Sequence, residues 1–486
     1  MNKNIAELTP VEVWQYFYEL TQIPRPSKKE GKAVDFMLNF GKNLGLETIK
    51  DEVGNVIIRK PATPGMENRE GIILQAHLDM VPQKNSDKVH DFEKDPITAY
   101  IDGEWVTADG TTLGADNGMG VAAAMAVLAS KTIKHGPIEG LFTIDEETGM
   151  TGAKNLQPGV LKGKILINLD SEDEGELYVG CAGGVDGTFT FKYKEENVPE
   201  NYELYKISVT GLKGGHSGMD ISLGRGNANK VMFRLLKTLR EKAATYLSYI
   251  SGGNMRNAIP REAFAVVAVP SDKVSVFTDT VSEVEKIIKA ELQVTEPDLK
   301  IGSEKIQFER TKASIIEKGI QNKLIDAICA CPNGVIRMSD TMPGLVETST
   351  NLAIVSSENG EVAVSCLLRS SVDTAKDDLA SMEESVFTLA GAESNFTGSY
   401  PGWKPNPDSF ILSKMKEVYK NMYGKEPEVK AIHAGLECGI LGGVYPNWDM
   451  ISCGPTIRHP HSPDEKVNIV SVEKWWSFLV ATLENI

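Results

Sequence analysis

Acidic side chains directly follow two of the most apolar strand-like segments of the sequence. Residues 139–145 (EGLFTID) lead into Glu146 and Glu147, and residues 164–170 (KILINLD) end in Asp170. Like charges at the ends of buried strands destabilise one another unless a cation offsets them. Ligands of an α/β sheet bind beyond the carboxyl ends of its strands, and carboxylates bind divalent ions. We therefore expect a cation site where these two strands end.

A histidine follows a third apolar strand-like segment, residues 71–76 (GIILQA). His77 and Asp79 are two residues apart, so in an extended chain both side chains point to one side. A metal-bound imidazole usually donates its other N–H to a carboxylate, which fixes the tautomer and the ring angle. The pair is compatible with a metal ligand and its orienting carboxylate. The alternative is a hydrogen-bonded structural histidine at a strand end.

Two further segments supply candidate ligands. Asp116 precedes a small-residue helix expected over residues 118–130, and its alternative role is that of a helix N-cap. Near the C-terminus, the sequence RHPHSPDE contains His459 and His461. Either histidine is able to serve as a late nitrogen ligand, and the spacing alone does not choose between them.

Together these residues predict a two-metal centre. One histidine and carboxylates around each of two ions, with one carboxylate shared, is a known arrangement for hydrolysis. The charges agree with it, because two divalent cations balance Asp116, Glu147, Asp170 and a bridging hydroxide.

The order of predicted elements indicates two domains. Strands alternate with helices over residues 1–186, which is typical of an α/β sheet with helices on both faces. Residues 187–397 combine strand-rich pairs with amphipathic helices and predict an inserted α+β domain. A Gly/Pro-rich stretch marks the end of the insert, and residues 398–486 return to α/β character and complete the first domain.

Other functional classes are disfavoured. The net charge of −16 repels phosphate backbones, so nucleic acid is not an expected partner. The sequence contains no apolar run of the ~20 residues that a membrane helix needs. Its N-terminus lacks the apolar region of a signal peptide, which predicts a cytoplasmic protein. Gly118 and Gly120 do not follow a buried strand, which argues against dinucleotide binding, and neither G-x-S-x-G nor H-E-x-x-H is present. The six cysteines form no C-x-x-C pair and are expected to be reduced thiols.

The motifs HLDMVP, GADNGMG, DEETGMTGA, NLDSEDEGE, GGHSGMDI and PHSPDEKVNI are together highly specific. Over nearly its whole length the chain resembles the co-catalytic zinc exopeptidase family, and within it the aminoacyl-histidine dipeptidases. Carnosinases and aminoacylase-type deacylases belong to the same family. The resemblance implies a mixed-sheet catalytic domain with an inserted lid and dimerisation domain. It also implies hydrolysis of dipeptides, Xaa-His and β-Ala-His among them, by a homodimer with two divalent ions per subunit, zinc first and cobalt or manganese as alternatives.

The resemblance also implies a role for each matching residue. The metal ligands are His77, Asp116, Glu147, Asp170 and His461, with Asp116 bridging the two ions and one histidine on each. Glu146 is the general base and acid, and Asp79 orients His77. In the insert, His216 stabilises the oxyanion, Arg369 binds the substrate carboxylate and Asn257 assists. The peptide bond between Asp116 and Asn117 is expected to be cis.

Two alternatives have different consequences. A deacylase of the same family, acting on N-acyl amino acids, would have the same metal ligands and would differ only in its substrates. A metal-binding protein without catalysis would have lost its base or part of its ligand set, but every one of these positions is intact.

Overall fold

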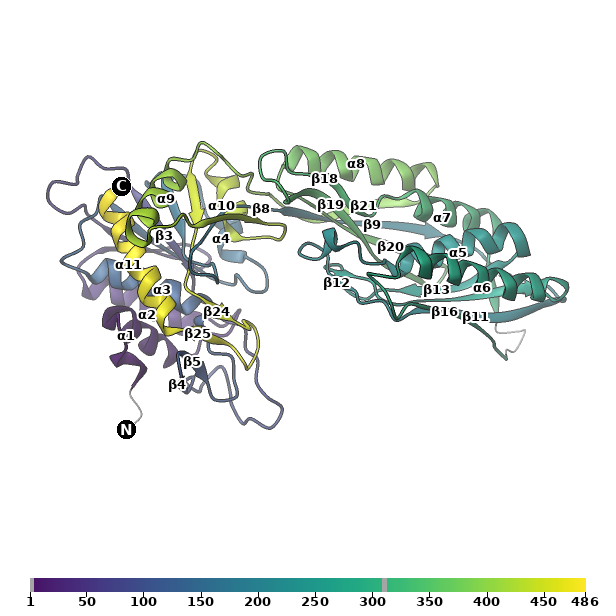
Figure 1. The fold of residues 1–486 in the computed structure, drawn as a ribbon, viewed down its shortest axis with the longest axis horizontal. Helices are drawn as coiled ribbons and strands as arrows, with labels where there is room; N and C mark the ends of the chain where they lie inside the picture. Colours follow the sequence, from purple (N-terminus) through teal and green to yellow (C-terminus); the bar gives the residue numbers. More distant parts are fainter. Residues whose placement is uncertain (1–3, 308–312) are drawn as a thin grey trace. The chain divides into compact units, whose positions relative to one another are not determined.

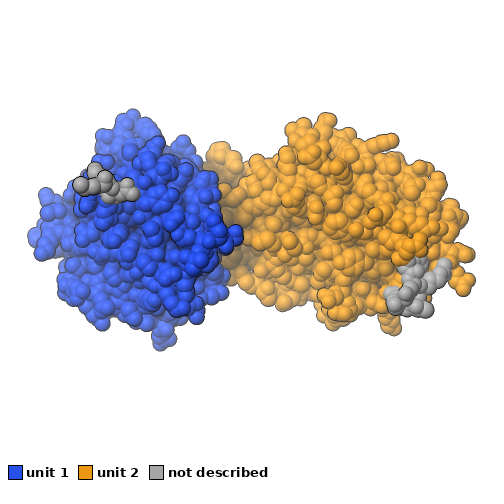
Figure 2. Space-filling model, turned by 90° about the horizontal axis from the view of Figure 1, so that it is seen from below, with its two compact units in different colours: residues 1–180, 403–431, 436–486 blue, residues 181–402, 432–435 orange. Residues whose placement is uncertain are grey.

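The computed structural model describes residues 4–307 and 313–486. Two compact units are present (Figure 2). Unit 1 contains the chain up to Gly180, Trp403–Ala431 and Leu436–Ile486, and unit 2 contains Cys181–Gly402 and Ile432–Gly435. The sequence predicts that the inserted domain covers residues 187–397, whereas the main segment of unit 2 covers residues 181–402. No helix among the described residues is long and apolar enough to span a membrane.

The core of unit 1 is a mixed eight-stranded sheet. In spatial order its strands are β1 (Glu47–Lys50), β2 (Val56–Lys60), β6 (Ile138–Thr143), β3 (Ile72–His77), β7 (Ile165–Asn168), β23 (Asp449–Ser452), β8 (Glu176–Cys181) and β22 (Glu428–Ile432). The central strands β6, β3, β7 and β23 are parallel to their neighbours within this group. Every residue of β3, β6 and β7 is buried, which explains their continuous apolar sequences.

Helices pack against this sheet and against one another (Figure 1). They are α1 (Val11–Thr21), α2 (Gly31–Asn43), α3 (Ala115–Ala129), α4 (Thr151–Asn155), α9 (Phe410–Tyr423), α10 (Glu437–Val444) and α11 (Ile469–Asn485). α3 contacts β3 and α1 at the same time, and it is buried along almost its whole length because its side chains are small. The predicted α/β class is therefore confirmed for this unit.

A separate four-stranded sheet in unit 1 was not expected from the sequence. It consists of β24 (Ile457–Arg458), β25 (Lys466–Asn468), β5 (Trp105–Ala108) and β4 (Ala99–Asp102). The loop between β24 and β25 carries His461, and β25 pairs with β5 just before the segment that leads to Asp116. This pairing brings the late histidine to a residue more than three hundred positions earlier.

Unit 2 is an antiparallel sheet covered by helices, as predicted for an α+β fold. Its strands, in spatial order, are β16 (Lys300–Lys305), β11 (Tyr202–Thr210), β15 (Ala263–Pro270), β13 (Tyr246–Gly252), β19 (Val346–Glu358), β20 (Glu361–Ser370), β9 (Gly183–Lys192) and β21 (Glu393–Tyr400), and β18 (Gly334–Met338) pairs with β19. The helices are α5 (Ala228–Ala243), α6 (Val274–Glu291), α7 (Lys318–Ala330) and α8 (Asp373–Leu389). Side chains of both layers form one apolar core.

Two elements of unit 2 are longer than the sequence pattern predicts. α6 was expected over residues 281–293, but it begins at Val274, because Phe277 and Val281 lie one helical turn apart and are buried on the same face. The strand expected over residues 352–356 begins at Val346. Its first half, ETSTN, has no apolar alternation, yet all five of these side chains are buried through polar contacts.

Stacked aromatic rings join α8 to the sheet of unit 2. Phe387 in α8 and Phe189 in β9 are fully buried, with ring centroids 4.0 Å apart. We expect Phe387→Ala to lower the free energy of unfolding of this unit by about 3–5 kcal/mol, since it leaves a cavity. Denaturant unfolding measures the change. Leu389→Ala, at a side chain 89% exposed on the same helix, is the control and should have little effect. Equal stability of the two variants would contradict this packing.

Candidate metal centre

The ends of three neighbouring strands place most of the candidate ligands. His77 is the last residue of β3 and lies opposite Thr143, the last residue of β6. Glu146 and Glu147 follow β6 after a short turn, and Asp170 follows β7. Because these strands are parallel, their carboxyl ends meet at one edge, as the sequence predicts.

One cluster contains His77, Asp116 and Asp170. The Nε2 atom of His77 lies 3.2 Å from Asp116 Oδ1 and 3.4 Å from Asp170 Oδ1. A second cluster contains Asp116, Glu147 and His461, in which His461 Nε2 lies 3.1 Å from Asp116 Oδ2 and 2.9 Å from Glu147 Oε2. Asp116 therefore presents one carboxylate oxygen to each cluster.

The side chains of these clusters fit two cations. Glu147 Oε1 and Asp170 Oδ1 are buried and have no hydrogen-bond partner among the described residues. Without a metal ion, hydrogen bonds to Asp116 and Glu147 raise the pKa of His461 to about 11, and burial raises the pKa of Asp170 to about 6. Histidine and carboxylate ligands suit zinc, cobalt or manganese. The arrangement can hold two divalent ions on either side of Asp116.

The carboxylate of Asp79 contacts both the ring of His77 and the backbone of the turn that follows β6. Its Oδ1 atom is 3.3 Å from His77 Nδ1, and its carboxylate accepts hydrogen bonds from the backbone N–H groups of Glu146 and Glu147 at 3.0 and 3.2 Å. Burial raises the pKa of Asp79, but contacts with His77 outweigh this and lower it to about 2. A carboxylate at Nδ1 leaves Nε2 directed at the first cluster.

Glu146 lies beside the clusters. One of its carboxylate oxygens is within 4.8 Å of ligand atoms of His77 and Glu147. Burial raises the pKa of Glu146 well above its usual range. Neighbouring acids in the same runs point elsewhere. Asp145 accepts hydrogen bonds from the hydroxyl groups of Thr148 and Thr151, and Asp173 pairs with Arg458. Of each acidic run, only part reaches the centre.

The backbone before Asp116 is held by two buried charged residues that the sequence analysis did not single out. The carboxylate of Glu465 accepts four backbone N–H groups, those of Leu113, Gly114, Ala115 and Asp116, at 2.8–3.1 Å. Burial raises the pKa of Glu465 to about 7, while these N–H donors oppose the rise. The motif PHSPDEKVNI contains this residue, but only the fold reveals its partners.

Arg25 holds the same segment from its carbonyl side. Its guanidinium donates to the carbonyl oxygens of Leu78, Asp79 and Gly114, and the residue is 2% exposed. One side chain thus joins the loop that carries His77 and Asp79 to the loop that carries Asp116. Arg25 also explains a glycine of the GADNGMG motif, since a Cβ at Gly118 would lie 2.6 Å from its Nη2 atom.

The peptide bond between Asp116 and Asn117 is cis, as expected. Asn117 donates from Nδ2 to the carbonyl oxygen of Leu169, the residue before Asp170. A Cβ at Gly120 would lie 2.5 Å from the same carbonyl oxygen, so a glycine is needed where α3 approaches the end of β7. The glycines of this motif therefore serve close packing beside the clusters.

The candidate residues His216 and Asn257 of unit 2 lie on or next to a pair of short strands. His216 in β12 (Gly215–His216) pairs with Ala258 of β14 (Ala258–Ile259), next to Asn257. Its Nδ1 atom accepts hydrogen bonds from the backbone N–H groups of Gly218 and Met219, so that the neutral ring carries its proton on Nε2. Burial and then the charge of Arg369 lower the pKa of His216, which favours this neutral form.

Arg369 is a buried cation with neutral partners. It is 5% exposed, and it donates from Nε to Ser217 Oγ at 3.4 Å and from Nη1 to the hydroxyl group of Tyr400 at 3.1 Å. No ion pair joins it to a carboxylate of the described residues. Since a buried charge normally has a partner, this guanidinium is suited to an anionic group from outside the chain.

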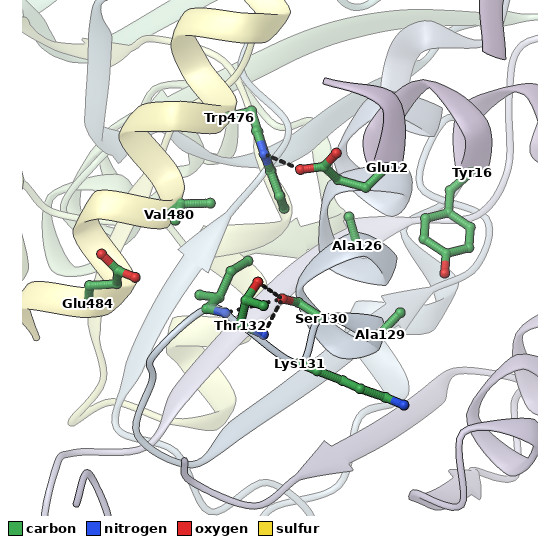
Figure 3. Close-up of a pocket in the computed structure, with 11 residues that line it drawn as sticks. Glu12, Tyr16, Ala126, Ala129, Ser130, Lys131, Thr132, Trp476, Val480 and Glu484 are labelled. Carbon is green, nitrogen blue, oxygen red and sulfur yellow. Dashed lines mark hydrogen bonds between the residues drawn. The ribbon is translucent and has the colours of Figure 1, made fainter. Parts of the chain in front are cut away.

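A cleft elsewhere in unit 1 does not belong to this centre. It has a volume of about 640 Å³ and lies between α1, the end of α3 and α11 (Figure 3). Glu12 and Trp476 lie on its wall and are joined by a hydrogen bond of 3.1 Å from the indole Nε1. None of the candidate ligands lines this cleft.

Comparisons with known proteins identify the family and the fold of the chain. Peptidase family M20/M25/M40 matches residues 73–485. The cytosol non-specific dipeptidase of Escherichia coli (strain K12) is 48% identical over 482 residues, which cover 99% of each chain. The crystal structure of aminoacylhistidine dipeptidase from Vibrio alginolyticus has a TM-score of 0.95 and 49% identity, and covers 100% of this chain and 98% of that chain. The aminopeptidase PepT from Bacillus cereus ATCC 10987 shares the fold, with a TM-score of 0.57 at 16% identity, and covers 98% of this chain and 99% of that chain. The predicted resemblance is confirmed.

The contacts of Glu465 generate a prediction about metal affinity. Glu465→Gln replaces one acceptor oxygen by an NH₂ group, so about half of the backbone donors lose their partner and the Asp116 segment loosens. We expect the affinity for zinc to fall by about 10–100-fold, as when a supporting side chain of a metal ligand is removed. Competition with a chromogenic chelator measures it. Glu473→Gln, at an exposed position of α11, is the control. Equal affinities in the two variants would show that Glu465 does not support the centre.

Proposed function

The chain belongs to peptidase family M20/M25/M40 and is a metallopeptidase, and from that premise we propose that it hydrolyses the amide bond of dipeptides. A single observation carries the proposal: Asp116 directs one oxygen to each of two His–carboxylate clusters. The full-length relatives named as dipeptidases support the substrate class. Among dipeptides we propose Xaa-His substrates, β-Ala-His included, because one of these relatives is an aminoacylhistidine dipeptidase.

His77 and Asp170 would hold one divalent ion, Glu147 and His461 the other, and Asp116 both. Zinc is the ion that we propose first, and cobalt or manganese fits the same ligands. Bound ions of this kind lower the pKa of water towards neutrality and polarise a carbonyl group. Asp79 keeps the Nδ1 proton of His77 directed at itself, so that the other ring nitrogen remains free as a ligand.

Glu146 is the proposed general base and acid. Its carboxylate lies next to both clusters but, unlike Asp116, is not shared between them. It would accept a proton from the attacking water and pass it to the leaving amine. The raised pKa of the buried carboxyl group suits this second step, because a carboxyl that retains its proton is able to donate it.

His216 and Arg369 are the proposed substrate contacts of unit 2. The Nε2–H group of neutral His216 would donate to the substrate carbonyl oxygen as negative charge develops there. Arg369 would bind the free C-terminal carboxylate, which would favour short substrates. Asn257, beside His216 in the β12–β14 pair, would assist in placing the substrate.

We also propose the roles of the two units, the oligomeric state, the cellular location and the partners of the protein. Unit 1 is the catalytic domain and unit 2 the lid and dimerisation domain of a homodimer, as the family resemblance implies. A cytoplasmic location follows the description of the Escherichia coli relative as a cytosol enzyme. We expect neither nucleic acid nor a membrane as a partner.

A substrate panel tests the proposed activity. We expect the metal-loaded protein to cleave β-Ala-His and Ala-His, to lose this activity on chelation, and to regain it with zinc, cobalt or manganese. Gly-Gly tests the breadth of dipeptide cleavage and Gly-His-Gly the length limit. Cleavage of N-acetyl-Met without dipeptide cleavage would identify a deacylase instead. Hydrolysis of none of these by metal-loaded protein would favour a metal-binding protein without catalysis.

Glu146→Gln isolates the proton transfer. Glutamine has nearly the shape of glutamate but cannot take up the proton, so we expect kcat to fall by about 10²–10⁴-fold or more with both ions retained. Steady-state kinetics and metal analysis of the same sample measure the two effects. Glu174→Gln, in the loop after β7, is a control that should keep the wild-type kcat. A wild-type kcat in Glu146→Gln would disprove this role.

Arg369→Met tests carboxylate binding. Hydrogen bonds to charged groups contribute about 1.5–3 kcal/mol, so kcat/KM for a dipeptide should fall by about 10–150-fold, mainly through KM. The ratio of activities on a dipeptide and on its C-terminal amide should fall as well. Arg234→Met, at a half-exposed arginine of unit 2 paired with Glu291, is the control. An unchanged preference for the free carboxylate in Arg369→Met would assign its recognition to another residue.

A further inference from the structure

Two cysteines and a glutamate meet in the core of unit 2, apart from every residue of the proposed mechanism. Cys331 directly follows α7, Cys366 lies in β20 and Glu383 lies in α8. Their exposed fractions are 2%, 0% and 0%. Both sulfur atoms and one carboxylate oxygen lie within 4.8 Å of one another. Three separate elements thus direct potential metal ligands at one buried point.

The carboxylate of Glu383 is only partly satisfied. Thr350 donates from its hydroxyl group to Oε1 at 2.6 Å. Oε2 is buried and has no hydrogen-bond partner among the described residues. Burial raises the pKa of this carboxyl group to about 7, while the hydroxyl group of Thr350 and the thiol of Cys366 oppose the rise. A carboxylate oxygen buried in this way is costly unless a proton or a cation accompanies it.

A cation is already present beside the cluster. Lys230 of α5 donates from Nζ to the carbonyl oxygens of Ile328, Cys329 and Cys331 at 2.7–3.0 Å. Its charge also acts on Cys366 and Glu383. Two thiolates and one carboxylate carry three negative charges, which Lys230 and one divalent ion would balance. The cluster with an ion would be neutral, so that no uncompensated charge is buried.

We propose that Cys331, Cys366 and Glu383 supply three of the ligands of one divalent ion that prefers thiolates, zinc foremost, in the core of unit 2. Zinc bonds of about 2.3 Å to sulfur and about 2.0–2.2 Å to oxygen place tetrahedral ligands about 3.4–3.8 Å apart. The present upper limit of 4.8 Å is about 1 Å beyond that spacing, so small side-chain movements would close the site.

Such an ion would join the end of α7, the strand β20 and the helix α8. β20 also carries Arg369, three residues after Cys366, so the ion would hold the strand that presents the proposed carboxylate contact. Both thiols lose their protons when they bind zinc. The site is independent of the two-ion centre, whose proposed ligands include no cysteine.

Cobalt distinguishes this site from the two-ion centre. The full-length protein is freed of metal, loaded with Co²⁺ and examined for the near-ultraviolet charge-transfer absorption of a cobalt–thiolate bond. Histidine and carboxylate ligands do not produce this absorption. We expect it in the wild-type protein and in Asp116→Asn, which alters only the two-ion centre. We expect it to disappear in Cys366→Ser, together with one equivalent of zinc per chain in the zinc-loaded protein.

Two further cysteine variants serve as controls. Cys329→Ser removes a nearby thiol of α7 that is not part of the cluster, and it should keep the absorption and the zinc content. Cys331→Ser replaces Cys366→Ser if the latter does not fold. Absence of the absorption from cobalt-loaded wild-type protein would overturn the proposal. So would its persistence in a folded cluster variant, or a disulfide between Cys331 and Cys366 found by mass spectrometry in the purified protein.

Discussion

The hydrogen bonds between the Glu465 carboxylate and four backbone N–H groups are the interaction on which the geometry of the metal centre depends. It fixes the segment from Leu113 to Asp116, while Arg25 binds the carbonyl oxygens of this segment and of the loop after β3. Asp116 owes its position between the two clusters to this pair of opposite charges. Both are buried, and each satisfies several backbone groups at once, which offsets the cost of removing them from water.

Both units bury polar groups, and in both some of these atoms lack a hydrogen-bond partner among the described residues. In unit 1, carboxylates gather at the ends of parallel strands, where some of their oxygens lack partners, and this suits them to cations. In unit 2, the polar first half of β19 is enclosed by specific bonds. Thr350 donates to Glu383, and Ser349 shares a hydrogen bond with His433. Asn351 donates to the carbonyl oxygen of Ala258 in β14. This strand therefore supports the pair of short strands that carries His216.

Several features were predictable from local sequence. The apolar segments before His77, Glu146 and Asp170 indicated strands with ligands at their ends, and the structure places these ligands at one edge. The domain that interrupts the α/β pattern was visible as a change in element type. The four-stranded sheet around β25 was not, because its strands are short and pair across most of the chain. The start of β19 was missed because its burial depends on hydrogen bonds and not on apolar side chains.

The sequence by itself determined which residue types were available to bind metal and where the strands that carry them end. Both can be read locally, because an apolar strand segment and the acidic residues that follow it are neighbours in the chain. It also indicated the family, through motifs whose combination is specific. The spacing left His459 and His461 equally open and the family resemblance implied His461, and the tertiary structure places His461 beside Asp116 and Glu147. Only the fold revealed the roles of Glu465 and Arg25 and the meeting of Cys331, Cys366 and Glu383. These contacts join residues far apart in the chain, and their distances depend on how whole elements pack.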